Sequence, residues 1–352
     1  MNWLWMSLYH ALGMLWMTFW ALVLGFGISA GLQVLVSKER MSRAFGRTSL
    51  KSVAAATGFG AASSSCSYAA AAAARSAIQQ GAAVVPALAF MFASTNLVIE
   101  LGVVLWILMG WRFVLAEFTG AFVLIALVWA QVKFIVPRSV IEDLKQHAQR
   151  GAGGGGGHSC HGDGHEHNHE HGDAKKGGKW AALAHAFIMD WSMMWKELLG
   201  GFVIAGFIAT LIPPSWWQTL FLKSGPAPLR LIENAIVGPI IAILSFVCSV
   251  GNIPLASHFW SSGISFGGVI AFIYADLLVV PLIIIYGKYY GARATAWLCG
   301  IFFVGMVTAG IVVDLIFNAL GLIPTGPRPP SAVSHEMIKW NYTSWLDIIA
   351  VV

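Results

Sequence analysis

Charged residues are scarce in this chain. Of its 352 residues only 11% are Asp, Glu, Lys or Arg, whereas 57% are hydrophobic, and a soluble domain carries about 25% charged residues. So few charges cannot cover a water-facing surface of this size, but lipid solvates apolar side chains directly. The net charge of +5 lies mostly in short stretches between apolar runs, where positive charge sets membrane orientation. The composition therefore excludes a soluble enzyme and a nucleic-acid-binding protein.

Signatures of catalysis are also absent from the sequence. It has no Walker loop, no zinc-protease helix motif, and no nucleophile elbow or paired-acid pattern. The four cysteines do not form a secreted disulfide framework, because two lie deep in apolar runs and one lies in a His-rich stretch. The N-terminus lacks the basic region of a cleavable signal peptide. We therefore expect neither an enzyme nor a bound cofactor.

Apolar runs long enough to cross a bilayer, about 20 residues each, recur along the chain. They predict an all-α polytopic membrane protein whose main partner is the lipid bilayer. The eight expected membrane-embedded segments are 11–36, 52–74, 82–109, 113–136, 196–213, 231–256, 264–287 and 294–321. The chain then divides into a first membrane repeat (1–136), a Gly/His-rich linker (137–194), a second membrane repeat (195–321) and an interfacial C-terminal tail (322–352).

The two membrane halves resemble each other in sequence. Cys66-Ser67 and Cys248-Ser249 are separated by the same offset as Gly81 and Gly263. Several such matches in the same order indicate an internal duplication, which many secondary transporters have.

Positive charge bears on the topology of these halves. The loop 38–51 and the central linker are both basic, so both are predicted to be cytoplasmic. Eight complete spans would instead place the linker outside. The conflict disappears if 52–74 and 231–256 are re-entrant, which is tolerated where irregular backbone lines protein or a cavity. The two repeats would then be inverted, with three crossings each.

The paired Cys-Ser motifs are the first candidate site. Gly251 and Pro254 follow the second motif and would free backbone carbonyls. A thiol beside hydroxyls and carbonyls suits a soft metal or metalloid, because sulfur ligands select soft ions. The alternative is that small Cys and Ser residues only allow close helix packing.

Polar residues in the later segments are candidates for ion coupling. Asp276 is central in an apolar run, where a carboxylate is costly unless it faces a cavity or a partner. The matching part of the first half holds Asn96, with Glu100 one turn on. We expect Asn96 to line the substrate pathway, and Asp276 and Glu100 to bind the coupling ion. The alternative role of Asp276 is a structural partner for Arg75, Arg112 or a backbone donor. Glu117, Glu233 and Asp314 lie nearer segment ends and are expected to reach the interface.

Histidines gather in the central linker. Imidazole and thiol groups there would collect metal ions without forming one defined site, unless the stretch is only a tolerated low-complexity linker. The predicted metal ligands are His158, Cys160, His161, His165, His167, His169 and His171.

At its two Cys-Ser motifs, the second of which continues to Pro254, the chain resembles the bacterial predicted-permease family that contains the organoarsenical exporters. The resemblance covers both membrane halves and implies a multi-pass exporter of the bacterial inner (cell) membrane. Relatives with a His-rich central loop are described as copper or zinc efflux transporters. The substrate path that the resemblance implies comprises Cys66, Ser67, Cys248, Ser249, Asn252 and Pro254.

The first motif departs from the family pattern. In the family the first motif often reads Cys-Ser-Cys-Ser followed by proline. This chain has Ser65-Cys66-Ser67-Tyr68 at the same place. Trivalent arsenic favours two or three thiolates, so a divalent metal such as zinc or copper is as well matched as an arsenical. We expect secondary efflux of a soft metal or metalloid. The alternatives are a permease for a small organic or sulfur-containing solute and a non-transporting membrane partner subunit, and a homo-oligomer also stays open.

Overall fold

The computed structural model describes most of the two membrane halves. It covers residues 3–9, 11–13, 15–16, 19–20, 23, 48–63, 67–79, 81–150, 179–211, 221–222, 225–245, 249–325, 328, 345 and 348. Cys66, Cys248 and all the predicted metal ligands of the His-rich stretch lie outside these residues.

Helices make up nearly all of the described chain, and no strand occurs within it. The first half contains α3 (Leu50–Ser63), α4 (Ser67–Gln79), α5 (Val84–Asn96), α6 (Ile99–Met109) and α7 (Trp111–Phe134). The central part contains α8 (Arg138–Arg150) and α9 (Lys179–Leu211). The second half contains α11 (Ala227–Ser245), α12 (Ser249–Ser262), α13 (Phe266–Ile273), the 3-10 turn η1 (Tyr274–Leu278), α14 (Val280–Tyr290) and α15 (Ala292–Ala319).

Three of the described helices, α7, α11 and α15, are long and apolar enough to cross a membrane. The count rises to five if each bent pair is one span: α5 with α6, bent by 43°, and α13–η1 with α14, bent by 49°. Eight spans are therefore not seen in the described residues. The expected segments 52–74 and 231–256 each contain parts of two helices, α3 and α4 in the first and α11 and α12 in the second. Helix α11 is long and apolar enough to cross a membrane by itself, whereas α3 is not.

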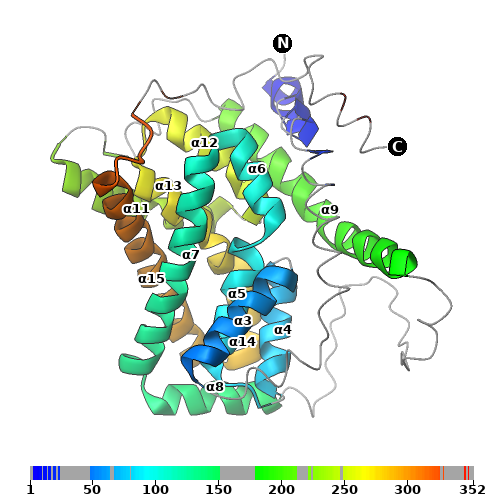
Figure 1. Ribbon diagram of the computed structural model, residues 1–352, viewed down its shortest axis with the longest axis vertical. Coiled ribbons are helices and arrows are strands. Elements are labelled where there is room, and N and C mark those ends of the chain that lie inside the picture. Colours follow the sequence, from blue (N-terminus) through cyan, green and yellow to red (C-terminus); the bar gives the residue numbers. More distant parts are fainter. Residues whose placement is uncertain are drawn as a thin grey trace.

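The helices of the two halves run in opposite directions (Figure 1). In that view α5 leads upward into α6, whereas α13 leads downward into α14. Helices α7 and α15 pack together and extend along most of the height of the molecule. The pair α3 and α4 lies in the lower part, and α12 lies at the top.

Glycines in left-handed backbone end helices at matching places in the two halves. Gly81 (φ +94°) and Gly263 (φ +103°) precede α5 and α13. Gly110 (φ +93°) and Gly291 (φ +79°) precede α7 and α15. Side chains disfavour this conformation, so the turns require glycine.

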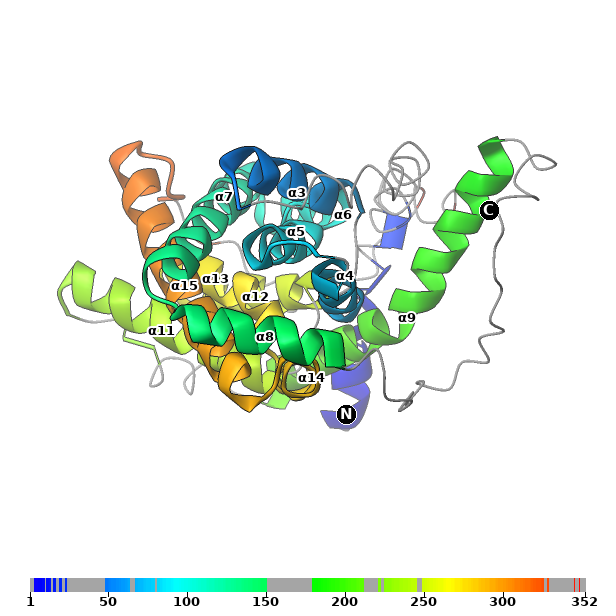
Figure 2. The same cartoon turned by 90° about the horizontal axis from the view of Figure 1, so that it is seen from below.

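The predicted linker begins as a helix, α8, which crosses the lower face of the molecule (Figure 2). Val140, Leu144 and Ala148 form a buried stripe along it at four-residue spacing, which is the period of an amphipathic helix. The Asp143 carboxylate accepts a hydrogen bond from Arg293 of α15 at 2.9 Å. The end of the range 137–194 is also helical, because α9 starts at Lys179. The glycine-rich stretch had obscured both helices in the sequence.

Candidate substrate and coupling site

The two motif serines meet at one carboxylate. Ser67 Oγ donates to Asp276 Oδ2 at 3.1 Å, and Ser249 Oγ donates to the same oxygen at 2.5 Å. Ser67 is the first residue of α4 and Ser249 the first of α12, and all three side chains are buried. The predicted motif serines and the predicted coupling residue thus form one buried cluster, although they come from three different elements.

A broken helix presents the Asp276 side chain. Asp276 lies in η1, where α13 gives way to α14. Pro281 accounts for the break, because it has no N–H to donate to the carbonyl oxygen of Leu277, four residues earlier. The hydroxyl of Tyr286 donates to that carbonyl oxygen instead, at 3.1 Å. The backbone leaves the α-helical path at this depth with its freed carbonyl still hydrogen-bonded.

Further polar groups surround this cluster. Thr95, at the end of α5, interacts with the Asp276 carboxyl, and its neighbour Asn96 donates to Thr95 Oγ1 at 3.0 Å. Asn252 lies one turn after Ser249 and is fully buried, yet neither polar atom of its amide has a hydrogen-bond partner among the described residues. A buried amide without partners is costly unless a ligand or water meets it. Asn252 is therefore well suited to bind a transported species.

Pro254 is the other motif residue of α12. It is buried inside the helix, where a proline removes the hydrogen bond to the carbonyl four residues earlier. That carbonyl belongs to Val250, the residue after Ser249. Pro254 therefore cannot donate to a carbonyl oxygen in the first turn of α12.

The arginines considered as structural partners of Asp276 make other contacts. The guanidinium of Arg75 lies 4.3 Å from the ring centroid of Tyr289, and that of Arg112 lies 5.7 Å from the ring of Trp111. The donors to Asp276 are instead the hydroxyls of both motif serines and of Thr95, together with the backbone N–H of Leu277. Glu100 is buried in the first turn of α6, where a helix N-terminus favours a carboxylate.

Glu117 was expected to reach the interface, and that expectation is wrong. Its side chain is 0% exposed, in the seventh position of α7. It belongs to the inward stripe of this helix, together with Phe113, Gly120 and Leu124. The sequence held the signal, because residues spaced by three and four share one helix face. The position of Glu117 near the start of an apolar run does not show which helix face it occupies.

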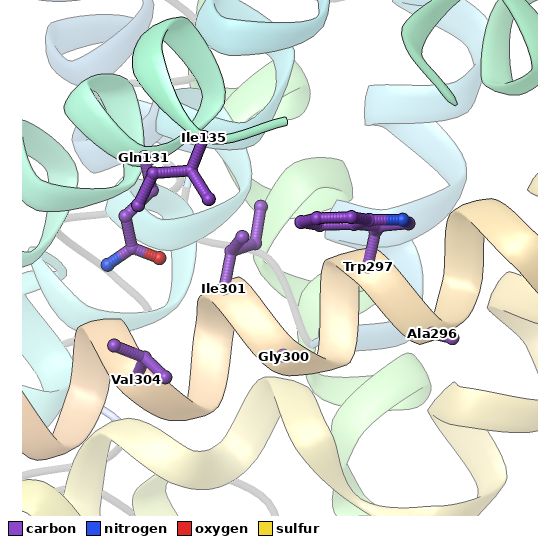
Figure 3. Close-up of a pocket in the computed structure, with 7 residues that line it drawn as sticks. All are labelled: Gln131, Ile135, Ala296, Trp297, Gly300, Ile301 and Val304. Carbon is purple, nitrogen blue, oxygen red and sulfur yellow. The ribbon is translucent and has the colours of Figure 1, made fainter. Parts of the chain in front are cut away.

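Two cavities in the described chain lie apart from the serine–aspartate cluster. One, of about 350 Å³, lies between α7 and α15 and has Gln131 as its polar lining residue (Figure 3). The other, of about 530 Å³, is lined mainly by apolar side chains of α3 and α7. Neither is lined by Ser67, Ser249 or Asp276. Their apolar linings suit lipid better than a metal species.

The described residues contain no group of three or more His, Cys, Asp or Glu side chains placed to hold a metal ion. The residues proposed to meet a soft ion, Cys66 and Cys248, each come directly before a serine of the cluster in the sequence. The described part of the site supplies hydroxyl, amide and carboxyl oxygen.

Comparisons with known proteins agree with a transport protein. A family model described as "Predicted permease", ArsP_1, matches residues 5–315. The chain is 43% identical over 306 residues to the "Putative permease Rv2963" of Mycobacterium tuberculosis, a match that covers 84% of this chain and 73% of that protein. No solved structure matches the chain. The chain therefore belongs to the ArsP_1 family of predicted permeases and is a multi-pass membrane protein.

Proposed function

We propose that this permease is a secondary exporter of a soft metal or metalloid species in the bacterial inner membrane. One observation carries the proposal: Ser67 and Ser249, each directly after a motif cysteine in the sequence, donate to the same buried carboxylate of Asp276. Thiolates select soft ions over hard ones. Cys66 and Cys248 are then the substrate ligands, and Asp276 is the proton or cation site that drives transport.

Asp276 can couple substrate to ion because its partners respond to its charge. Hydroxyl donors and helix N-termini both stabilise an ionised carboxylate. The first residues of α4 and α12 are the donors here. Protonation of Asp276 weakens both hydrogen bonds, which loosens the two helix starts next to the motif cysteines. Ion binding at Asp276 and substrate binding at the cysteines are thereby linked.

We also propose that the two halves are inverted repeats, with α3–α4 and α11–α12 re-entrant. Three features support this arrangement: the opposite courses of α5–α6 and α13–α14 (Figure 1), the matched glycine turns, and the matching order of α3 and α4 and of α11 and α12 on either side of the motifs. In this topology the loop 38–51 and the His-rich stretch are cytoplasmic. The histidines gather metal ions near the inner opening of the pathway, and Glu100 is a second coupling residue.

Cysteine labelling tests the topology. Single cysteines in a cysteine-free background are placed at Ser49 and Gln79, which flank α3–α4, and at Leu222 and Ser262, which flank α11–α12. A membrane-impermeant maleimide applied to intact cells should label only the second pair, and permeabilised cells should label both pairs. Labelling of Ser49 and Gln79 from opposite sides would show that α3–α4 crosses the membrane.

Growth assays test the substrate class. A metal-sensitive host expressing the chain is grown with zinc, copper, nickel, arsenite or methylarsenite, beside the Cys66→Ala/Cys248→Ala double variant at matched expression. We expect resistance to one of these species, with resistance lost in the double variant because its soft ligands are gone. The matched control is Cys299→Ala, since Cys299 lies in α15 outside the motifs, and it should retain resistance.

Each other result has a defined meaning. If the double variant keeps its resistance, the two cysteines are not substrate ligands and serve only in helix packing. That result would favour an organic or sulfur-containing solute. No resistance to any of the five species, with the protein present in the membrane, would count against metal and metalloid export. Stable co-purification with a second protein would then favour a partner subunit.

A further inference from the structure

Glu117 is a buried acidic residue on α7, a helix that is long and apolar enough to cross a membrane. Its side chain is 0% exposed, and neither of its oxygens has a hydrogen-bond partner among the described residues. An ionised carboxylate buried without a partner carries a large desolvation cost. Such a group is stable as the neutral acid, or when a cation meets it. The Glu117 carboxyl can therefore take up and release a proton, and it has no role in the export mechanism proposed above.

Glu117 is tied to the turn that carries Asp276. The hydroxyl of Tyr274, two residues before Asp276 in η1, donates to the Glu117 carbonyl oxygen at 2.7 Å. Gly120 of α7 makes room for this contact, because a Cβ atom there would overlap the Tyr274 hydroxyl. The five-residue turn η1 thus carries Asp276, which contacts the serines, and Tyr274, which hydrogen-bonds to α7 at Glu117.

Burial disfavours a negative charge on Glu117, and a negative charge on Asp276 disfavours it further. Tyr274 interacts with Glu117 as well. The helices packed against α7 are α5, α6, α13 and α15, of which α5 and α13 carry no titratable side chain. The titratable groups on α6 and α15 are Glu100, Arg293, Cys299 and Asp314. Asp314 accepts a hydrogen bond from the Gly267 amide at 2.7 Å, and Arg293 pairs with Asp143.

We propose that Glu117 and Asp276 form a pair that holds one proton between them. Two like charges in a low-dielectric interior disfavour each other, so ionisation of one carboxyl favours the neutral form of the other. Neither Glu117 oxygen hydrogen-bonds to Asp276, so the proton passes by way of water. The O–H bond of the Glu117 acid breaks as water accepts its proton, and a new O–H bond forms as water donates a proton to the Asp276 carboxylate, which leaves Glu117 ionised. Glu117 is the proton reservoir for the coupling site. This inference rests on the coupling role proposed for Asp276.

Infrared difference spectroscopy of the full-length protein in liposomes, with no transported solute present, tests the pair. Protonated buried carboxyls give a C=O band that carboxylates lack, and the band is followed as pH changes. We expect one such band to disappear in Glu117→Gln. In Asp276→Asn, the pH at which the remaining acid ionises should differ from that in the wild type, because two interacting groups titrate as a pair. Absence of a Glu117 band, or an unshifted titration in Asp276→Asn, would overturn the proposal.

Controls separate this result from misfolding and from failure of the export proposal. Glu142→Gln on α8 removes an exposed carboxyl and should leave the buried bands unchanged. Glu117→Asp keeps a carboxyl and should keep a band, which serves if Glu117→Gln does not fold. Because the probe is the proton alone, the outcome does not depend on which solute is transported. A coupled pair in a protein that confers no metal resistance would sustain this inference and refute metal export.

Discussion

Asp276→Asn is expected to reduce export at least about tenfold while leaving the protein folded. Asparagine has nearly the same shape as aspartate and retains an oxygen to accept from Ser67 or Ser249, but it carries no charge and binds no proton. A hydrogen bond to a charged group contributes about 1.5–3 kcal/mol, so weakening one of the two should reduce transport at least about tenfold. Efflux of the species identified by the growth assay, measured in inverted membrane vesicles, checks this expectation.

Other variants show whether this effect belongs to the cluster. Asp314→Asn alters an aspartate of α15 whose carboxylate accepts from the Gly267 amide, and it should retain most transport. Ser67→Ala and Ser249→Ala should each reduce transport, and the double variant should approach the level of Asp276→Asn. Export by Asp276→Asn at the wild-type rate and with the wild-type pH profile would remove Asp276 from the coupling mechanism.

Gly120→Ala is expected to destabilise the folded protein strongly. A Cβ atom at this position would overlap the Tyr274 hydroxyl and lie 2.7 Å from Val313 Cγ2. Overpacking of a filled interior costs about 1–3 kcal/mol, and here it would force apart α7, η1 and α15. The thermal midpoint of the detergent-purified protein should fall clearly, as should the yield of monodisperse protein.

A matched glycine and a second-site change make this test specific. Gly300 of α15 has no atom within 4 Å of its added Cβ, so Gly300→Ala should be neutral or slightly stabilising. Adding Tyr274→Phe to Gly120→Ala removes the overlapping oxygen and should recover part of the lost stability. If the single variant melts with the wild type, the contact between α7 and η1 is not as tight as described.

The sequence singled out the residues of the buried cluster but not the way they meet. Asp276, Ser67 and Ser249 could be selected one at a time, because polar groups are conspicuous in apolar runs. Their meeting could not be predicted, because it depends on how α4, α12 and η1 pack. Short-range patterns do not encode contacts between residues that are far apart in the sequence.

The number of spans depends on packing as well. The eight apolar runs stay a prediction, since within the described residues three helices, or five if each bent pair is one span, are long and apolar enough to cross a membrane. The stripe of α8 is also a signal in the sequence, because Val140, Leu144 and Ala148 recur every four residues. The burial of Glu117 follows from the helix face that it occupies and not from its distance to the end of an apolar run.

The hydrogen bond from Tyr286 to the Leu277 carbonyl oxygen gives the bent α13–α14 segment a self-contained elbow. Both partners belong to that segment, so the carbonyl freed at Pro281 is satisfied without help from neighbouring helices or water. Under the proposed coupling role, α4 and α12 would move relative to this bent segment while its angle stays the same. Asp276 would then keep its position, and the starts of α4 and α12 would control access to it from either side of the membrane.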